Sequence, residues 1–332
     1  MSQLPESEVK DFQKTFGELQ AEMSKAVVGC QDIIRDMLVC FFAGGNLLIE
    51  SSPGLGKTLL VKTLSRVIDL KFSRVQFTPD LMPADILGTN IVTEGADGKR
   101  YFEFQKGPIF TQLLLADEIN RATPKTQSAL LEAMQERRVT IAGKTYDLEK
   151  PYYVVATQNP QDTDGTYSMP EAQLDRFFFK LQLEKPAIAN MREISQQASS
   201  SSDTELRRVI DGPKAEAFKK LVLAVEAPRP LRQFAIKLVL LTHPGSEMSL
   251  ETAKKYLRYG SSPRGVQALI LGAKVLALIG GRSVAEPKDV MGVARQVLGH
   301  RLMMNFEGEA ESITAASILD EAFKSKELSS VA

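Results

Sequence analysis

The sequence predicts an α/β fold with an open parallel sheet, followed by a smaller all-helical domain. In the first half of the chain, short apolar runs alternate with helical patterns. Each run is too short for a buried helix and suits a central strand of a parallel sheet. After about residue 185, a serine-rich loop over 199–203 precedes helical patterns that are punctuated by proline. We therefore expect an N-terminal helical segment over 1–25, an α/β core over 26–185 and a helical domain over 186–332.

The first expected strand leads into a helix through a glycine-rich turn. Leu47-Leu48-Ile49 forms the apolar run, and Leu60, Leu64, Val67 and Ile68 then fall on one face of a helix. Further strands of the same sheet are expected at Leu113–Ala116, Tyr153–Ala156 and Phe177–Phe179.

Two β-hairpins are expected as insertions in this plan. The first pairs 91–93 with 101–104 across a turn that contains Asp97-Gly98. The second pairs 139–141 with 145–147 across a turn at 142–144. Glycine in each turn supplies the positive φ that tight hairpins need. Hairpins inserted into an α/β sheet suggest added working parts rather than core.

The composition is typical of a soluble globular protein and argues against several classes of function. The 332 residues carry 41 basic and 41 acidic side chains, without the basic surplus typical of proteins that bind nucleic acid. The two cysteines and two histidines stand outside metal-ligand spacings, which disfavours zinc and Ser-His-Asp chemistry. The polar N-terminus is not that of a signal peptide, and no apolar stretch approaches the roughly 18 residues of a membrane helix. We expect a cytoplasmic protein.

The strongest motif lies between the first expected strand and its helix, and it reads Ser52-Pro53-Gly54-Leu55-Gly56-Lys57-Thr58. This strand-loop-helix arrangement aims unpaired backbone N–H groups and the helix dipole at a phosphate. Lys57 would reach the β- and γ-phosphates of ATP, and Thr58 would hold Mg²⁺ through its hydroxyl. The motif asks for glycine at position 51, where this chain has Ser51, so the tightness of the loop and its affinity for nucleotide are open to question. A Pro-Gly turn with a solvated lysine is the alternative, which the Gly-Lys-Thr ending disfavours.

Two adjacent carboxylates, Asp117 and Glu118, end the apolar strand at 113–116. In an open α/β sheet, ligands bind beyond the carboxyl ends of the strands, where the phosphate-binding loop also lies. Asp117 is therefore expected on the Mg²⁺ side, and Glu118 is expected as the base that orients an attacking water. A solvated acidic turn would be favoured for this pair alone, but it is disfavoured beside the loop.

Three further polar residues are candidates. Asn159 follows another buried strand and could polarise the water or the γ-phosphate, although an Asn-Pro pair is more often a turn. Arg264 is expected in the first turn of a helix whose N-cap would be Ser262, where a cation opposes the helix dipole by about 0.3–1 kcal/mol. A nearby phosphate would reverse that sign, while a tolerated exposed arginine explains it equally well. Arg176 is by default a solvated cation at a helix end.

Several longer stretches stand in a fixed order along the chain, densest from Val27 to Phe179: Val27–Gly29, Gln76–Asp80, Gly107–Phe110, Leu113–Ala122, Pro124–Val139, Thr157–Pro160 and Gly165–Phe177. Together with the phosphate-binding loop, they resemble the MoxR family of AAA+ ATPases over nearly the whole chain. The chain departs from the family pattern at Ser51-Ser52, at Cys30 and at Asn46.

The resemblance implies roles that spacing cannot give. It implies an AAA+ P-loop core with hairpin inserts and a helical lid. Asn159 would be sensor 1, and Arg264 would be sensor 2, brought to the nucleotide by the lid. Arg176 would be an arginine finger given to a neighbouring subunit's ATP. The resemblance further implies a hexameric, chaperone-like ATPase whose inserts face the pore or a partner, often with a partner protein that carries a von Willebrand factor A domain.

Three functional hypotheses remain at this point. The first is Mg²⁺-dependent ATP hydrolysis that drives remodelling, assembly or activation of client protein complexes. The second is a nucleotide-gated scaffold with little hydrolysis, which Ser51 favours slightly. The third is a DNA motor of related architecture, which the zero net charge disfavours.

Overall fold

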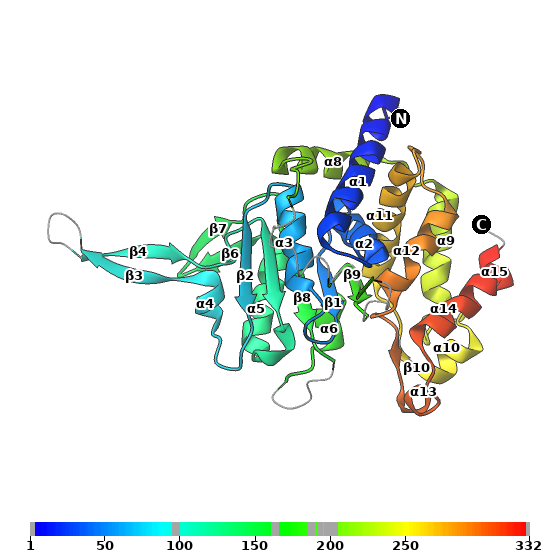
Figure 1. Cartoon of the computed structure of the whole chain (residues 1–332). Coiled ribbons are helices and arrows are strands. Elements are labelled where there is room, and N and C mark those ends of the chain that lie inside the picture. The colour runs from blue at the N-terminus through cyan, green and yellow to red at the C-terminus, as the bar shows by residue number, and fades with distance from the viewer. Residues whose placement is uncertain are drawn as a thin grey trace.

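The computed structural model describes residues 4–94, 100–160, 166–184, 190, 191, 195 and 205–329. Its centre is a five-stranded sheet in the order β2-β5-β8-β1-β9, in which all neighbouring strands run parallel (Figure 1). This sheet confirms the predicted parallel α/β core. Its strands are β1 (Leu47–Glu50), β2 (Phe72–Gln76), β5 (Leu113–Asp117), β8 (Tyr153–Gln158) and β9 (Phe179–Gln182).

Two strands differ from the sequence prediction. β9 begins at Phe179, so Phe177 and Phe178 precede the strand rather than belong to it. β2 lies outside the prediction, because Val75 is the one fully buried residue among its five and the strand has no apolar run. It pairs with β5 along its whole length and forms the edge of the sheet.

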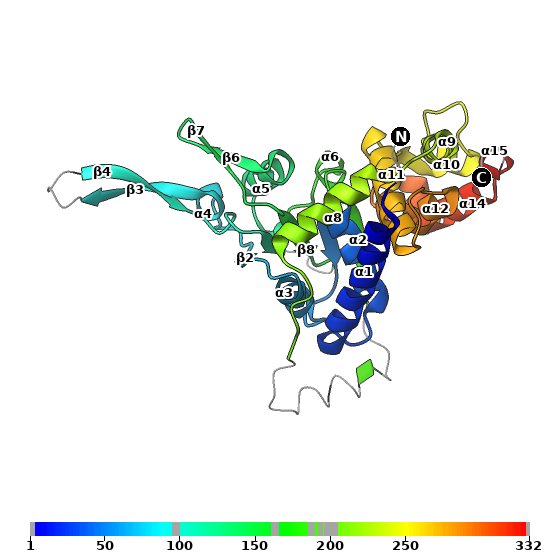
Figure 2. The same cartoon turned by 90° about the horizontal axis from the view of Figure 1, so that it is seen from above.

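Helices cover both faces of the sheet (Figure 2). Alternate residues of β5 enter two separate apolar clusters, Leu113 and Leu115 on one face and Leu114 and Ala116 on the other. The first face is covered by α1 (Glu6–Ala26), α2 (Gln31–Phe42) and α3 (Lys57–Val67). The second is covered by α4 (Pro83–Leu87) and α5 (Pro124–Glu136), with the short η1 (Ile119–Arg121) and α6 (Glu171–Leu174) near the ends of the strands. The apolar face predicted for α3 is buried as expected.

Both predicted hairpins are present, as β3 (Gly88–Glu94) with β4 (Arg100–Lys106) and as β6 (Arg138–Ile141) with β7 (Lys144–Asp147). The first projects far from the body beyond the β2 edge (Figures 1 and 2). Its predicted Asp97-Gly98 turn lies outside the described residues. Phe104 of β4 stacks on Tyr146 of β7 with ring centroids 4.5 Å apart, so the bases of the two hairpins contact each other.

The C-terminal part of the chain is helical, as predicted, and lies beyond the β9 edge (Figure 1). Its helices are α8 (Gly212–Ala224), α9 (Arg229–Leu241), α10 (Glu251–Tyr256), α11 (Pro263–Ile279), α12 (Pro287–Leu298), α13 (Phe306–Ala310), α14 (Ala315–Lys324) and α15 (Lys326–Ser329). One feature is additional: β10 (Leu257–Tyr259) and β11 (Met303–Met304) form a small antiparallel sheet, too short for a sequence pattern. The expected boundary at 185/186 and the serine-rich loop over 199–203 lie outside the described residues.

The predicted N-terminal segment corresponds to α1, which joins the sheet-bearing part of the chain to the helical part. Phe12 lies 5.2 Å from both Phe42 of α2 and Phe218 of α8, measured between ring centroids. Gln13 Nε2 donates to the carbonyl of Ile279 at the end of α11, at 2.9 Å. Across the described residues, none of the helices has the length and apolar character needed to cross a membrane.

Candidate nucleotide site

The predicted phosphate-binding loop connects β1 to α3 and has the backbone that the motif requires. Gly54 and Gly56 both have φ near +81°, a left-handed conformation that suits glycine. Among the described residues, apart from each glycine's two chain neighbours, no heavy atom lies within 4 Å of the point where a Cβ would stand on either glycine, so this part of the structure leaves room above them. Gly56 precedes the first residue of α3 and offers no side-chain cap, so the first N–H groups of the helix are available to a ligand. The loop therefore has room and donors for a phosphate.

Ser51 fits the loop without backbone strain. Among the loop residues, all of which the structure describes, positive φ occurs at Gly54 and Gly56 and not at Ser51. The Ser51 N–H donates to the Gln158 carbonyl at 3.1 Å, which fastens the loop to the end of β8. Lys57 Nζ donates to the Ser51 carbonyl at 3.4 Å from a largely buried side chain. A serine at position 51 is thus compatible with the backbone of this loop.

A cavity of about 440 Å³ adjoins the loop, lined by Glu50, Ser51, Ser52, Leu55, Pro160, Gln182, Leu183 and Glu184. Its polar wall is organised around Glu50, the last residue of β1. Burial raises the pKa of Glu50, but the Lys180 ammonium at 3.0 Å and hydrogen bonds from Gln158 and Gln182 outweigh burial and hold that pKa below its ordinary value. A charged, fixed carboxylate therefore stands beside the candidate phosphate site.

Asp117 ends β5 as a buried carboxylate with both oxygens engaged. Thr157 Oγ1 donates to Asp117 Oδ1 at 2.6 Å, and Arg74 Nη2 donates to Asp117 Oδ2 at 2.7 Å. The Asp117 residue is 6% exposed. The Arg74 guanidinium reaches it from β2, the strand that the sequence did not predict. The predicted acid therefore lies at the carboxyl edge of the sheet, held by its two neighbouring strands.

Glu118 stands one residue beyond the strand with φ at 57°, a left-handed conformation that costs a non-glycine residue about 1–3 kcal/mol. Its N–H donates to Thr157 Oγ1 at 2.9 Å, so one hydroxyl positions both acidic residues. Its carboxylate accepts from Gln76 Nε2 at 2.8 Å and pairs with Arg121 at 3.0 Å. Strain of this kind clusters at functional sites, which agrees with the role expected for Glu118.

Asn159 follows β8 at the same edge of the sheet and is 3% exposed. Its carbonyl accepts from Asn120 Nδ2 at 3.5 Å, which links it to the segment after β5. The loop, Asp117, Glu118 and Asn159 thus meet where the carboxyl ends of β1, β5 and β8 lie side by side.

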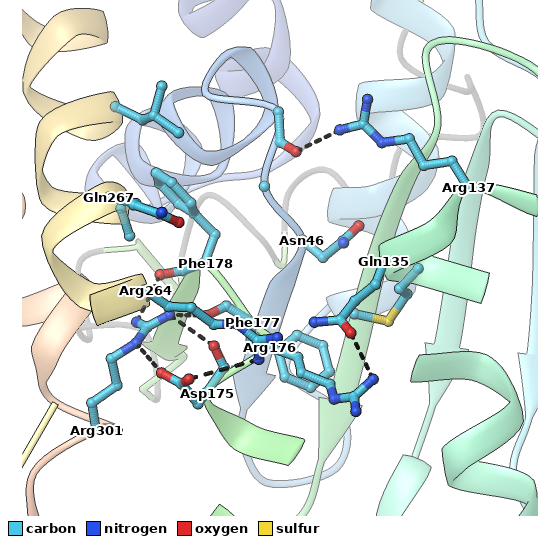
Figure 3. Close-up of a pocket in the computed structure, with 15 residues that line it drawn as sticks. Asn46, Gln135, Arg137, Asp175, Arg176, Phe177, Phe178, Arg264, Gln267 and Arg301 are labelled. Atoms are coloured by element: carbon cyan, nitrogen blue, oxygen red, sulfur yellow. Dashed lines mark hydrogen bonds and ion pairs between the residues drawn. The ribbon is translucent and has the colours of Figure 1, made fainter. Parts of the chain in front are cut away.

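The two predicted arginines lie together in a second pocket, of about 300 Å³, between the sheet and the helical part (Figure 3). Residues 44–46, which precede β1, and Phe177 and Phe178, which precede β9, line it together with Arg176 and Arg264. This pocket is therefore at the amino ends of these strands. The phosphate-binding loop is at the carboxyl end of β1, about 13 Å away along four residues of strand.

Comparison with known proteins identifies the family. A model described as "ATPase family associated with various cellular activities (AAA)" matches residues 46–179, and an AAA lid domain model matches 250–322. The chain is 36% identical over 310 residues to Chaperone MoxR1 of Mycobacterium tuberculosis, which covers 93% of this chain and 81% of that protein. The chain belongs to the MoxR family of AAA+ ATPases.

Two further matches agree with this assignment. Protein MoxR of Paracoccus denitrificans is 28% identical over 336 residues, covering 96% of this chain and 97% of that protein. The solved structure of a candidate ATPase from Cytophaga hutchinsonii superposes with a TM-score of 0.89 at 38% identity and covers 96% of each chain. The MoxR-type chain is thus an ATP-hydrolysing enzyme with an AAA core and a lid.

The lid of this MoxR-type chain does not hold Arg264 beside the loop of the same chain, and the expectation that the lid brings Arg264 to a nucleotide stays a prediction. Arg264 Nη1 lies 3.7 Å from Asp175 Oδ2, next to Arg176 and at the opposite end of β1 from the loop. Arg176 Nη1 donates to Gln135 Oε1 at 2.7 Å, so it is not merely a solvated cation.

Several residues that organise this site were not predicted from the sequence. Thr157 stood in a recognised stretch, and its position one strand away from Asp117 could have indicated the shared hydroxyl. Arg74 and Gln76 belong to β2, whose pattern gave no strand signal. Arg301 stands in no motif, although it reaches Asp175 across 126 residues of sequence.

Proposed function

We propose that this chain hydrolyses ATP with Mg²⁺ in a ring-shaped oligomer, where each active site is composite. One subunit would supply the loop Ser52–Thr58, Asp117, Glu118 and Asn159, and the next would supply Arg176 and Arg264. The observation that carries this proposal is the separation of the two sets, at opposite ends of β1 in one chain. A neighbouring subunit that presents its amino edge to the carboxyl edge would bring them together.

The residues at the carboxyl edge fit a Mg²⁺–ATP complex. The open backbone at Gly54 and Gly56 and the unpaired helix N–H groups suit the phosphates, and Lys57 suits their charge. The Thr58 hydroxyl and the Asp117 carboxylate are hard oxygen ligands of the kind that Mg²⁺ prefers. The metal would neutralise charge that develops on the phosphates. Glu118 would then orient the water, and Asn159 would polarise it or the γ-phosphate.

The amino-edge pocket fits the other half of the site. Arg264 lies in the first turn of α11, where the Ser262 side chain caps the helix by accepting from the Arg264 N–H. A cation at this position is disfavoured by about 0.3–1 kcal/mol unless an anion lies close. Asp175 Oδ2, 3.7 Å from Arg264 Nη1, already offsets part of this cost, and a neighbour's phosphates would offset more of it. Arg176 in the same pocket would stabilise charge on the transferred phosphoryl group, an effect worth about 10³–10⁵ in rate.

Client remodelling is the proposed use of the ATPase cycle. It is supported by the name of the Mycobacterium tuberculosis relative, a chaperone, and by the hairpins that project beyond β2 (Figure 1). Val92 and Phe102, cross-strand partners in the first hairpin, are 58% and 76% exposed. A hexamer, a partner with a von Willebrand factor A domain and a cytoplasmic location remain parts of this proposal, carried by the family. The alternative is a nucleotide-gated scaffold with little hydrolysis, for which Ser51 was the argument; Ser51 does not have a positive φ.

The proposal is tested by steady-state ATPase activity measured against protein concentration, alongside sizing with and without ATP and with Mg²⁺ removed by EDTA. Specific activity is expected to rise as the protein assembles and to require Mg²⁺. Glu118→Gln and Arg176→Ala are each expected to abolish it while ATP still binds. Specific activity that stays constant from the monomer upward would contradict the composite site. Bound ATP without hydrolysis at every concentration would favour a scaffold.

A further inference from the structure

Asp175, the residue before Arg176, connects the segment that carries Arg176 to the lid through hydrogen bonds and ion pairs (Figure 3). Its Oδ1 accepts from Arg301 Nε at 2.8 Å, and its Oδ2 accepts from Ser262 Oγ at 2.8 Å. Arg264 lies 3.7 Å from the same Oδ2. One carboxylate therefore contacts the cap of α11, the arginine in its first turn and a second arginine after α12.

Arg301 also donates hydrogen bonds to backbone carbonyls that precede and follow Arg176 in the sequence. Its Nη2 donates to the carbonyls of Asp175 at 3.1 Å and Phe177 at 2.7 Å, and its Nη1 donates to that of Phe178 at 3.3 Å. The Arg301 side chain is 3% exposed. Its guanidinium thus bonds carbonyls of residues on both sides of Arg176, and rotation of the segment would break several charge-assisted hydrogen bonds at once.

A buried ion pair is weak evidence for stability as such. Removing two charges from water costs several kcal/mol per ion, and apolar residues of similar volume often serve stability as well or better. A buried pair of this kind is more informative as a geometric constraint. Here it constrains the four residues Asp175–Phe178 against a lid element far away in the sequence.

Arg176 itself is held in a way that leaves donors available. Gln135 accepts from its Nη1, whereas its buried Nε has no hydrogen-bond partner among the described residues. A buried guanidinium N–H without a partner is costly, and an oxygen ligand arriving at the pocket would remove that cost.

We propose that Asp175 and Arg301 are positioning residues that couple the lid to Arg176, so that Arg176 and Arg264 move as one unit relative to the neighbouring subunit's nucleotide. The inference rests on the proposed function, in which Arg176 acts on the neighbour's ATP. The coupling would let lid position in one subunit set the hydrolysis rate in the next. If this contact between lid and core served folding alone, its loss would lower hydrolysis at the variant subunit's own ATP site as well, or would not lower hydrolysis at all.

Mixing experiments between variants distinguish these roles. In a mixed ring, an Arg176→Ala subunit keeps its own loop and Glu118, and a Glu118→Gln subunit keeps its own Arg176. The mixture therefore regains active interfaces. Asp175→Asn keeps the shape of the side chain but cannot accept from both lid partners. It is expected to lower kcat by about 10- to 100-fold, the effect of misplacing a reacting group by about 1 Å. ATP binding to its own loop is expected to stay unchanged.

The expected pattern is that Asp175→Asn regains activity when it is mixed with Glu118→Gln and does not when it is mixed with Arg176→Ala. Arg301→Lys, which keeps the charge but cannot bond Asp175 and several carbonyls together, should follow the same pattern with a smaller defect. If Asp175→Asn does not assemble, Arg301→Lys alone carries the test. The matched control is Asp289→Asn, which disrupts the 2.6 Å lid ion pair with Arg282 and should leave kcat unchanged.

Three results would overturn the inference. In the first, Asp175→Asn and Arg301→Lys keep the wild-type kcat. In the second, they gain no activity when mixed with Glu118→Gln, although Arg176→Ala does gain activity in that mixture. In the third, they regain activity when mixed with Arg176→Ala. If Arg176→Ala and Glu118→Gln do not complement each other, the composite site itself fails and the inference fails with it. That last outcome is distinguishable because it needs no change at Asp175.

Discussion

Thr157 Oγ1 donates a 2.6 Å hydrogen bond to Asp117 Oδ1, joining the ends of β8 and β5 through two buried side chains. The same hydroxyl accepts from the N–H of Glu118. One side chain therefore orients the acid proposed to bind Mg²⁺ and the backbone of the residue proposed to activate water.

Replacing Thr157 with valine tests this relationship. Thr157→Val keeps the shape but leaves a buried carboxylate oxygen and an N–H without their partner, at a cost of about 1–3 kcal/mol in the free energy of unfolding. We expect kcat to fall at least about tenfold. The control is Thr242→Val, because Thr242 is equally buried but, within the described part of the chain, its hydroxyl bonds only to carbonyls of α9, the helix that it follows. Equal kcat in both variants would refute a role for the Thr157 hydroxyl.

The loop geometry predicts that Ser51 is neutral for nucleotide binding. Ser51→Gly should change the Kd for ATP by less than about threefold, because Ser51 already has an allowed φ. Gly56→Ala should weaken binding strongly, since a left-handed conformation costs an L-residue about 1–2 kcal/mol. Titration with a fluorescent ATP analogue compares the two. A large gain in ATP affinity in Ser51→Gly would contradict this prediction and would mean that serine at position 51 weakens nucleotide binding.

Lys219 of α8 predicts a pH dependence of stability. Burial lowers its pKa to about 8, only partly opposed by Glu216, whose carboxylate lies 3.4 Å away. The unfolded chain keeps this proton to a higher pH than the folded chain does. The free energy of unfolding contributed by Lys219 therefore rises with pH from about 8 upward, and the cost of burying the charge is present in full below that pH.

Chemical denaturation at pH 7 and pH 9 measures this effect. The stability of the wild type relative to Lys219→Met should rise by about 1 kcal/mol between these two pH values. Lys220→Met, at an exposed position next along the helix, provides the control and should show no such change. A difference that stays constant with pH would mean that Lys219 keeps its proton throughout.

The contact between the hairpin bases predicts a local stability effect. Phe104 and Tyr146 stack at 4.5 Å, an arrangement worth about 0.5–1.5 kcal/mol beyond burial. Tyr146→Leu should accelerate hydrogen exchange in β3 and β4 by about 2- to 10-fold without changing ATPase activity. Tyr101→Leu, at a half-exposed position on the same hairpin, should leave the exchange rates unchanged. Equal exchange in both variants would show that the stack does not hold the hairpin.

The sequence predicted the parts of the fold and site that depend on local pattern. β5 and β8 were predictable because their residues are almost wholly apolar, and the loop at Ser52–Thr58 because glycine and lysine stand at fixed spacing. β2 was not predictable, because Val75 is the one buried residue among its five. The contact of Arg74 with Asp117 could therefore not be predicted either.

The relationships that cross long stretches of sequence were also beyond prediction. The resemblance implied that the lid brings Arg264 to a nucleotide, but it could not show that Arg264 lies beside Asp175, in the segment before β9. Arg301 carries no motif at all, because its role comes from tertiary contacts with backbone carbonyls. Local residue type could mark Arg264 as a candidate, and the family resemblance marked Arg176. The structure then placed both arginines at the edge of the sheet opposite the loop.

The most direct test of the composite site is the ATPase activity of Arg176→Ala and Glu118→Gln, measured separately and as an equal mixture that has been allowed to exchange subunits. Because the loop and the arginines lie at opposite ends of β1, each variant alone should be nearly inactive and the mixture should be clearly active. A mixture no more active than the sum of its two components, with sizing that demonstrates mixed assemblies, would contradict the account.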